Sequence, residues 1–358
     1  MNGCNIVKME QPAIELNKLT IGYTHNGKEI SVMGDINATL MSGEMVALIG
    51  ANGAGKSTLM RTLSAFQKQL SGDIVYGKNR VNAKKADELA TTLAVVLTGS
   101  NKIYNMSVRE VVALGHTPYT NFIGHIRAHD EEIIDRAMQR VNIAHLADRD
   151  INAISDGERQ KVMIAKALAQ ETPIIFLDEP TAFLDYPSKV EILHLLHRLS
   201  REMNKTIFLS THDLELALQI ADQIWLMDRE KGVLVGTPED LAIDGSLENF
   251  FYQRKGIAFE KETGLYRIDN EYWTTICLES TSERSTMVQK AFRRNGIRAT
   301  SETDSEVSVL IDDVHEQYIL KLKGNEYSRY STIKELLPVT LELLKDRNTL
   351  KNKSNDER

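Results

Sequence analysis

A glycine-rich loop constrains this chain more than any other stretch. Residues 50–58 read GANGAGKST, which fits the pattern G-x-x-x-x-G-K-[ST]. The apolar run EMVALIG leads into the loop, and a segment with helical character follows it. Glycines let successive backbone N–H groups curl around a phosphate without interference from Cβ atoms. The loop therefore predicts a nucleotide-phosphate site between a buried strand and a helix.

The residue types of the loop have distinct expected tasks. We expect Lys56 to bridge the β- and γ-phosphate oxygens, and the Ser57 hydroxyl to be a ligand of Mg²⁺. A plain glycine turn followed by a lysine is the alternative, but such a turn does not need a strand before it and a helix after it. The expected nucleotide-binding residues of the loop are Gly50, Ala51, Asn52, Gly53, Ala54, Gly55, Lys56, Ser57 and Thr58.

Two later apolar runs, read as buried strands, end in polar residues that suit hydrolysis. PIIFLDEP places Asp178 and Glu179 at a strand end, and LSTHD places His212 just beyond the next strand. Asp178 could hold Mg²⁺ through water, and Glu179 could polarise the attacking water as a general base. The imidazole of His212 could reach the γ-phosphate. Taken alone, these residues could be a solvated strand exit and a turn histidine, but the phosphate loop upstream favours catalysis.

A third motif lies at the start of a predicted helix. AISDGERQKVMIAKALAQ, residues 153–170, begins with Ser155, Asp156 and Gly157. Free N–H groups at such a helix start form an anion site, although Ser155 or Asp156 could also cap its own helix. No anion partner is evident nearby in sequence. The apolar face expected for this helix comprises Val162, Ile164, Ala165, Leu168 and Ala169.

Together these motifs resemble the nucleotide-binding subunit of ABC transporters. The resemblance implies that the loop at 50–58 is Walker A and that IIFLDEP is Walker B with catalytic Glu179. It also implies that Tyr23 stacks on adenine, that Asp185 belongs to the D-loop and that His212 is the switch histidine.

The same resemblance, which covers about Ile14 to Ala242, gives the third motif a role. ISDGE matches the signature motif LSGGQ. In such ATPases two copies pack head to tail, and this helix caps the γ-phosphate held by the other copy. Ser155, Gly157 and Glu158 would thus act in trans, so that ATP joins a homodimer and hydrolysis releases it.

The chain departs from the family pattern at two sites. Asp156 replaces a glycine of the signature, and Glu158 stands where the family often has Gln. We hypothesise that the Asp156 charge weakens ATP-driven dimerisation. Thr98 occupies the Q-loop position, where the family has a Gln that approaches Mg²⁺. A threonine hydroxyl can still act through water, with a shorter reach.

The length of 358 residues favours two domains. We expect an α/β P-loop NTPase core of the ABC ATPase type over 12–246, with an antiparallel β subdomain and a helical subdomain. Strand-like and helix-like runs over 247–346 predict a small accessory α+β domain of order β-α-β-β-α. Its last helix would be broken or kinked at Pro338. The polar tail 347–358 is expected to be disordered.

Composition limits the partners. The net charge of −7 and the absence of a long basic block argue against nucleic-acid binding. Cys4 and Cys277 lie far apart and fit no metal or disulfide pattern. No run approaches the ~18 apolar residues of a membrane span, and the start lacks the apolar stretch of a signal peptide. Any membrane role is therefore expected to come through a partner.

VREVVALGHTPYT, residues 108–120, resembles the ATPases of iron-chelate, haem and vitamin B12 importers. This resemblance implies an ATP- and Mg²⁺-dependent homodimer on the cytoplasmic face of the membrane. It would dock on a permease through residues around Thr98 to His125, and an extracytoplasmic substrate-binding protein would deliver the cargo. Two alternatives stay open. An exporter ATPase shares every catalytic residue, and a soluble ABC ATPase usually joins two cassettes or carries long coiled coils.

Overall fold

The computed structural model describes residues 11–77, 79–80, 86–97, 105–119, 127–251, 257–260, 265–268, 271–280, 282–301 and 305–356. The chain divides into two compact units. The first comprises Met1–Gln253 with Phe259–Tyr266, and the second comprises Arg254–Ala258 with Arg267–Arg358. Among the described residues, no helix has both the length and the apolar composition needed to cross a bilayer.

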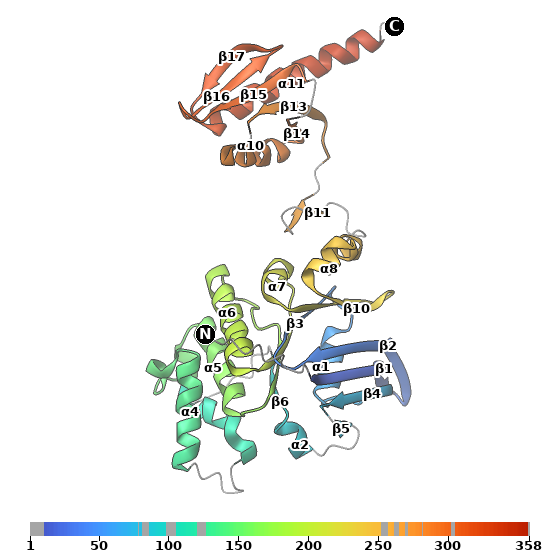
Figure 1. The fold of residues 1–358 in the computed structure, drawn as a ribbon, viewed down its shortest axis with the longest axis vertical. Coiled ribbons are helices and arrows are strands. Elements are labelled where there is room, and N and C mark those ends of the chain that lie inside the picture. The colour runs from blue at the N-terminus through green and yellow to red at the C-terminus, as the bar shows by residue number, and fades with distance from the viewer. Residues whose placement is uncertain are drawn as a thin grey trace, which may run out of the picture. The chain divides into compact units, whose positions relative to one another are not determined.

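A six-stranded sheet forms the centre of the first unit (Figure 1). Its strand order is β10-β9-β3-β8-β7-β6, and every neighbouring pair is parallel except β9 with β10. Strands β3, β7 and β8 are mainly apolar and almost completely buried because both faces of the sheet are covered. Their bounds are β3 Met45–Gly50, β6 Leu93–Val96, β7 Ile174–Asp178, β8 Thr206–Ser210, β9 Gln223–Asp228 and β10 Gly232–Gly236.

A second, antiparallel sheet has the order β2-β1-β4-β5. Its strands are β1 Pro12–His25, β2 Lys28–Met41, β4 Ser71–Tyr76 and β5 Asn79–Arg80. The inner face of this sheet packs with helix α1, Lys56–Leu63, and with one face of the central sheet in a common core. The sequence Gly34-Asp35 is a typical turn signal, but no turn occurs there. Strand β2 continues through it, with Asp35 at a φ of 54° and a register shift opposite in β1.

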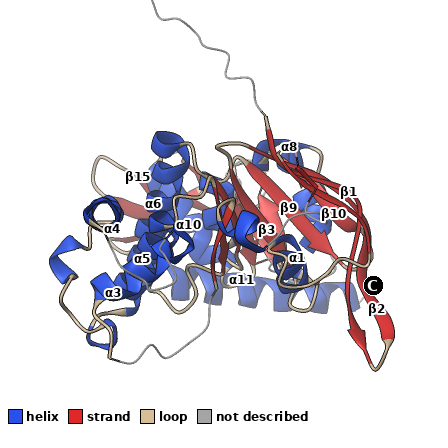
Figure 2. Ribbon diagram, turned by 90° about the horizontal axis from the view of Figure 1, so that it is seen from below, coloured by secondary structure: helices blue, strands red, loops and turns tan. Residues whose placement is uncertain are grey.

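Helices lie on the other side of β3 (Figure 2). Between Val108 and Gln170 they form the expected helical subdomain, and two helices of the core follow it. The apolar face predicted for α5 is buried at all five positions. These helices are α3 Val108–Ala113, α4 Ala128–Arg140, α5 Asp156–Ala169, α6 Tyr186–Met203 and α7 Leu214–Ile220, with 3-10 helices η2 Leu114–Tyr119, η3 Ala144–Leu146 and η4 Ile151–Ala153. A further helix, α2 Ala86–Ala90, packs its Leu89 against the core of the antiparallel sheet.

The second unit contains a five-stranded sheet of order β14-β13-β15-β16-β17. The predicted order β-α-β-β-α therefore lacks two strands. β14 has only four residues, and β17 is a largely exposed edge strand whose polar sequence NEYSRY gives no apolar pattern. The elements are β13 Thr274–Glu279, α10 Glu283–Arg293, β14 Ile297–Thr300, β15 Val307–Asp312, β16 Gln317–Leu322, β17 Asn325–Tyr330 and α11 Ile333–Asp356.

Helix α11 differs from the expectation at two points. It continues through Pro338, which lies in its second turn, so the predicted break is not found. It also extends to Asp356, so residues 347–356, expected to be disordered, are helical. The polar composition of this tail misled the prediction, because a helix that has already formed can extend through polar residues of good helix propensity.

The core of the first unit extends past the domain boundary expected at residue 246. Helices α8 Pro238–Ile243 and α9 Ser246–Phe251 are followed by strands β11 Ile257–Glu260 and β12 Leu265–Ile268. Leu247 is fully buried and Phe259 is 8% exposed, and both join the main apolar core. The Tyr266 hydroxyl donates to the Leu247 carbonyl at 2.8 Å. The first unit therefore needs these residues.

Truncation tests this extension of the core. A chain ending at residue 246 lacks buried Leu247 and Phe259, and should lose roughly 4 kcal/mol or more of stability. Thermal unfolding followed by circular dichroism should show a Tm roughly 10 °C below that of a chain ending at Tyr266. Equal Tm values for the two truncated chains would contradict the assignment.

Candidate active site

The candidate site lies where three parallel strands of the central sheet end. Strand β8 runs between β3 and β7, so Ser210 at its end is in register with Leu48 on one side and with Asp178 on the other. The strand order thus brings the glycine loop and the acid pair to one edge, although they are distant in sequence. Carboxyl ends of parallel strands are the usual place for ligand sites in α/β proteins.

The backbone of the loop requires glycine at two positions. A Cβ at Gly50 would lie 2.6 Å from the Met227 carbonyl oxygen. Gly55, the residue before α1, has a φ of 109°, and a Cβ there would lie 2.7 Å from a Val32 methyl carbon. Any side chain at either site would therefore displace backbone or a neighbouring strand.

Lys56 is held inside the loop. Its side chain is buried, and Nζ donates to the carbonyl oxygens of Gly50 at 2.8 Å and Ala51 at 3.3 Å. The loop carbonyls thus fix the ammonium at the N-terminus of α1, where the helix end already favours an anion. Lysine and helix end together place positive charge where a phosphate could bind.

Arg229, from the turn between β9 and β10, also holds the loop. Its Nε donates to the Gly53 carbonyl at 2.7 Å. The prediction from sequence missed this residue, because the two positions are 176 residues apart and no motif marks the arginine. The bond stabilises the outer turn of the loop.

Ser210 fixes both acids of the pair. Its hydroxyl donates to Asp178 Oδ1 at 2.6 Å and accepts from the Glu179 N–H at 3.0 Å. Glu179 has a φ of 47°, in the left-handed region, which costs a non-glycine residue about 1 kcal/mol. Sequence reasoning overlooked Ser210, although it stands in the quoted LSTHD motif. The serine holds the strained turn and orients the carboxylate of Asp178.

Glu179 and His212 are in direct contact. His212 Nε2 lies 2.6 Å from Glu179 Oε1, and both side chains are partly exposed. They line a cleft of about 390 Å³ together with Phe183 and with the ion pair of Lys189 and Asp213. The imidazole can thus orient the carboxylate toward a water molecule in the cleft. Glu179 and His212, which follow different strands in the sequence, are thus in contact in the structure.

The N-terminus of α5 carries a capping box. The N–H and the hydroxyl of Ser155 each donate to Glu158 Oε2 at 2.8 Å, and the Glu158 N–H donates back to Ser155 Oγ at 3.3 Å. The hydrogen bond from the Ser155 N–H is the main cause that lowers the pKa of Glu158. Ser155 therefore caps its own helix, as the alternative interpretation expected, and Glu158 takes part.

The packing around Gly157 within this chain leaves room for a side chain. Among the described residues, a Cβ there would meet only the Ser188 side chain, at 3.5 Å or more. The absence of a side chain instead leaves the helix end open to a group approaching from outside. Asp156 does not cap the helix. Its carboxylate accepts from Arg159 Nη1 at 2.9 Å, at an exposed position.

Asp185, Tyr23 and Thr98 are the other residues for which the sequence predicts a role in the site. Asp185 caps α6, because its carboxylate accepts from the Ser188 N–H at 3.0 Å, and this contact with Ser188 lowers its pKa. Tyr23 in β1 is 48% exposed, so its ring is free to stack on a ligand. Thr98 lies outside the described residues, as does much of the stretch from Thr98 to His125.

Loop, acid pair and sheet order together define a P-loop ATPase cassette. Residues 33–182 match the ABC transporter family, and residues 274–339 match the iron ABC transporter C-terminal domain. The chain is 38% identical over 257 residues to an uncharacterized ABC transporter ATP-binding protein, MJ0873, of Methanocaldococcus jannaschii, covering 72% of this chain and 87% of the relative. The chain therefore belongs to the ATP-binding proteins of ABC transporters, and it is an ATPase.

Relatives and solved structures agree with this family. The ferric enterobactin transport ATP-binding protein FepC of Escherichia coli is 34% identical, over 65% of this chain and 85% of its own. The probable siderophore transport ATP-binding protein YusV of Bacillus subtilis is 31% identical over 80% and 100%. The dimeric structure of the bacterial ABC transporter cassette MJ0796 matches at 26% identity, with a TM-score of 0.55 over 63% of this chain and 98% of that chain.

Ser210 gives a test of the site geometry. Ser210→Ala should lower kcat for ATP hydrolysis by about ten- to a hundredfold, because residues that orient a metal-binding carboxylate have effects of this size. The KM for ATP should change little. Ser200→Ala is the matched control, since Ser200 is equally buried but donates to Gly43 elsewhere. Unchanged kcat in Ser210→Ala, or an equal loss in the control, would contradict the role.

Proposed function

We propose that this chain is the ATP-hydrolysing subunit of an importer for an iron chelate, haem or a cobalamin-type compound. The observation that carries this proposal is the pairing of an ABC cassette with a module of the iron ABC transporter C-terminal type. Relatives named for siderophore, enterobactin and cobalamin transport support it. Neither an exporter ATPase nor a soluble ABC ATPase would account for that C-terminal module.

The proposed assembly is a homodimer on a membrane permease, at the cytoplasmic face, with an extracytoplasmic substrate-binding protein delivering the cargo. The helix end at Gly157 supports the dimer, because Gly157 carries no side chain that would cover the first N–H groups of α5. In the proposed dimer, Ser155, Gly157 and Glu158 face the γ-phosphate of ATP bound by the other copy. The similar bacterial cassette MJ0796 has a dimeric structure, which supports a dimer.

Within one copy, the loop from Gly50 to Thr58 would hold the phosphates and Tyr23 the adenine. Ser57 and Asp178 would hold Mg²⁺, Asp178 through water. The fit is good, because hydroxyl and carboxylate oxygens suit this ion and Ser210 already orients the Asp178 carboxylate. The bound ion would neutralise phosphate charge.

Glu179 would take the proton of the attacking water. His212, 2.6 Å from its carboxylate, would orient it and contact the γ-phosphate. Asp185, at the start of α6, would carry the D-loop contact to the other copy. Thr98 would take the Q-loop position near Mg²⁺. In this scheme hydrolysis removes the shared γ-phosphate and with it the attraction between the two copies.

Asp156 should weaken the ATP-driven dimer. Its exposed carboxylate is paired with Arg159 but still adds negative charge near the proposed phosphate. Asp156→Gly should therefore dimerise at a lower ATP concentration, by about threefold, in sedimentation velocity. Asp148→Gly, which removes an exposed charge outside the motif, is a control. Dimerisation of Asp156→Gly that equals or falls below that of the unaltered chain would contradict the hypothesis.

Glu179→Gln gives the test of the proposed function. The variant should bind ATP, fail to hydrolyse it and accumulate as a closed dimer, because the general base is lost while the phosphate loop stays intact. Tagged Glu179→Gln chain with ATP should then recover a permease from detergent-solubilised membranes, identified by mass spectrometry. Lys56→Ala, which should bind ATP poorly, is the control for ATP-dependent capture.

The identity of the captured protein decides between the classes. A permease of the iron-chelate, haem or cobalamin type supports the proposal. An exporter permease would replace the importer with an exporter. Ribosomes, DNA or this chain alone would point to a soluble ABC ATPase. Fast hydrolysis by Glu179→Gln would remove Glu179 as the base.

A further inference from the structure

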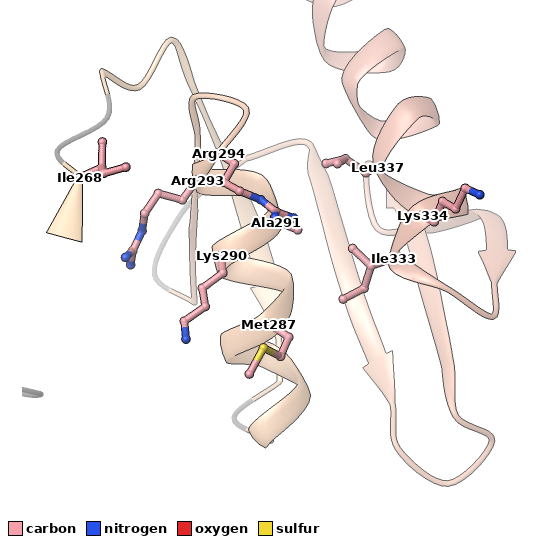
Figure 3. A pocket seen from close by; sticks show the side chains of 9 residues that line it. All are labelled: Ile268, Met287, Lys290, Ala291, Arg293, Arg294, Ile333, Lys334 and Leu337. Atoms are coloured by element: carbon pink, nitrogen blue, oxygen red, sulfur yellow. The ribbon is translucent and has the colours of Figure 1, made fainter. Parts of the chain in front are cut away.

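The second unit has a groove of about 750 Å³ between α10 and the start of α11 (Figure 3). All of its lining residues belong to that unit, and none belongs to the ATPase machinery described above. The lining residues are Ile268, Met287, Lys290, Ala291, Arg293, Arg294, Ile333, Lys334 and Leu337.

The surface of the groove is mainly apolar. In Figure 3, Ile333 and Leu337 lie on the side of α11 that faces α10, and Ala291 lies on α10. Ile268 is 73% exposed and Met287 is 56% exposed. Covering such side chains with an apolar group is favourable, at about 25 cal/mol per Å² removed from water. A ligand with an apolar body would therefore be stabilised here.

Four cationic side chains line this groove together with the apolar ones, and none of the described lining residues is acidic. Elsewhere in the unit, three cations are closely paired with acids: Arg284 with Glu316 at 3.0 Å, Arg329 with Glu326 at 2.6 Å, and Lys321 with Glu279 at 2.5 Å. Within the described part of the chain, Lys290, Arg294 and Lys334 form no such ion pair. Uncompensated positive charge thus collects at one groove of a chain whose net charge is −7.

Helix stability explains part of this charge, but not all of it. Lys290 and Arg293 lie in the last turn of α10, where the helix dipole favours cations. Lys334 is the second residue of α11, where the dipole disfavours a cation. Glu335 already stabilises the start of this helix, because its carboxylate accepts hydrogen bonds from the N–H groups of Ser331 and Thr332. Lys334 therefore adds positive charge to a helix end that is already positive.

We propose that this groove binds a small organic anion that combines an apolar body with a carboxylate, phosphate or sulfonate head. The apolar body would lie over Met287, Ile333 and Leu337, and the head would meet Arg294 and Lys334. The volume falls within the ~300–1,000 Å³ range of small-molecule sites, which are mostly apolar with a few placed polar groups. The proposal is independent of the cargo and of the ATP site.

The aromatic sulfonate 8-anilinonaphthalene-1-sulfonate is a suitable probe, because its fluorescence rises in apolar surroundings and its head is an anion. The full chain should bind it saturably with MgATP present, which keeps the nucleotide site filled. The double variant Arg294→Glu with Lys334→Glu should weaken binding about tenfold or more, since two attractive charges become repulsive. The uncharged analogue N-phenyl-1-naphthylamine should bind the unaltered chain more weakly and should not respond to the charge reversal.

A matched double variant, Arg298→Glu with Lys323→Glu, makes the same charge change in the same unit outside the groove. It should bind the sulfonate as the unaltered chain does. Equal weakening in both double variants, or no weakening in the groove variant, would overturn the proposal. Two further results would overturn it, provided that the sulfonate binding of the groove variant is unchanged. One is a change of its oligomeric state in sedimentation velocity, and the other is a loss of its binding to anionic phospholipid vesicles.

Discussion

The pairing of β8 between β3 and β7 is the interaction on which the site depends. It places Ser210 beside Asp178 and Glu179 and in register with the strand that leads into the phosphate loop. The side-chain hydroxyl then fixes the acid pair, and the left-handed turn at Glu179 points its carboxylate toward His212. Parallel strands place all of these groups at one edge of the sheet. The pairing of a few apolar strand residues therefore determines the positions of the polar side chains.

The other half of the proposed site is the N-terminus of α5. The capping box of Ser155 and Glu158 keeps α5 formed, and Gly157 leaves its N-terminus open. A phosphate held by a second copy would complete both halves. The same principle, positive charge beside a helix end, recurs in the second unit, where Lys334 lies at the start of α11 and Arg294 lines the same groove. There an apolar groove replaces the glycine loop, which indicates a different kind of anion.

Local motifs allowed the prediction of the cassette, including its loop, its strand ends and the buried face of α5, because each depends on residues close in sequence. Contacts between distant segments could not be predicted in this way. Arg229 reaches Gly53 across the sheet, and Leu247 and Phe259 extend the core beyond residue 246. Weakly patterned elements were also missed: β17 has a polar exposed sequence, and α11 continues through Pro338 and a polar tail.

The most direct test of a site shared between two copies is complementation in a mixed dimer. One copy carries Lys56→Ala and the other Gly157→Asp, a change that the surroundings of Gly157 tolerate because only the Ser188 side chain is near. Each variant alone should hydrolyse ATP poorly. If Gly157 acts in trans, a one-to-one mixture should recover about a quarter of full activity, since half of the dimers are mixed and each has one intact site. A mixture as inactive as its components, although mixed dimers form, would contradict the account.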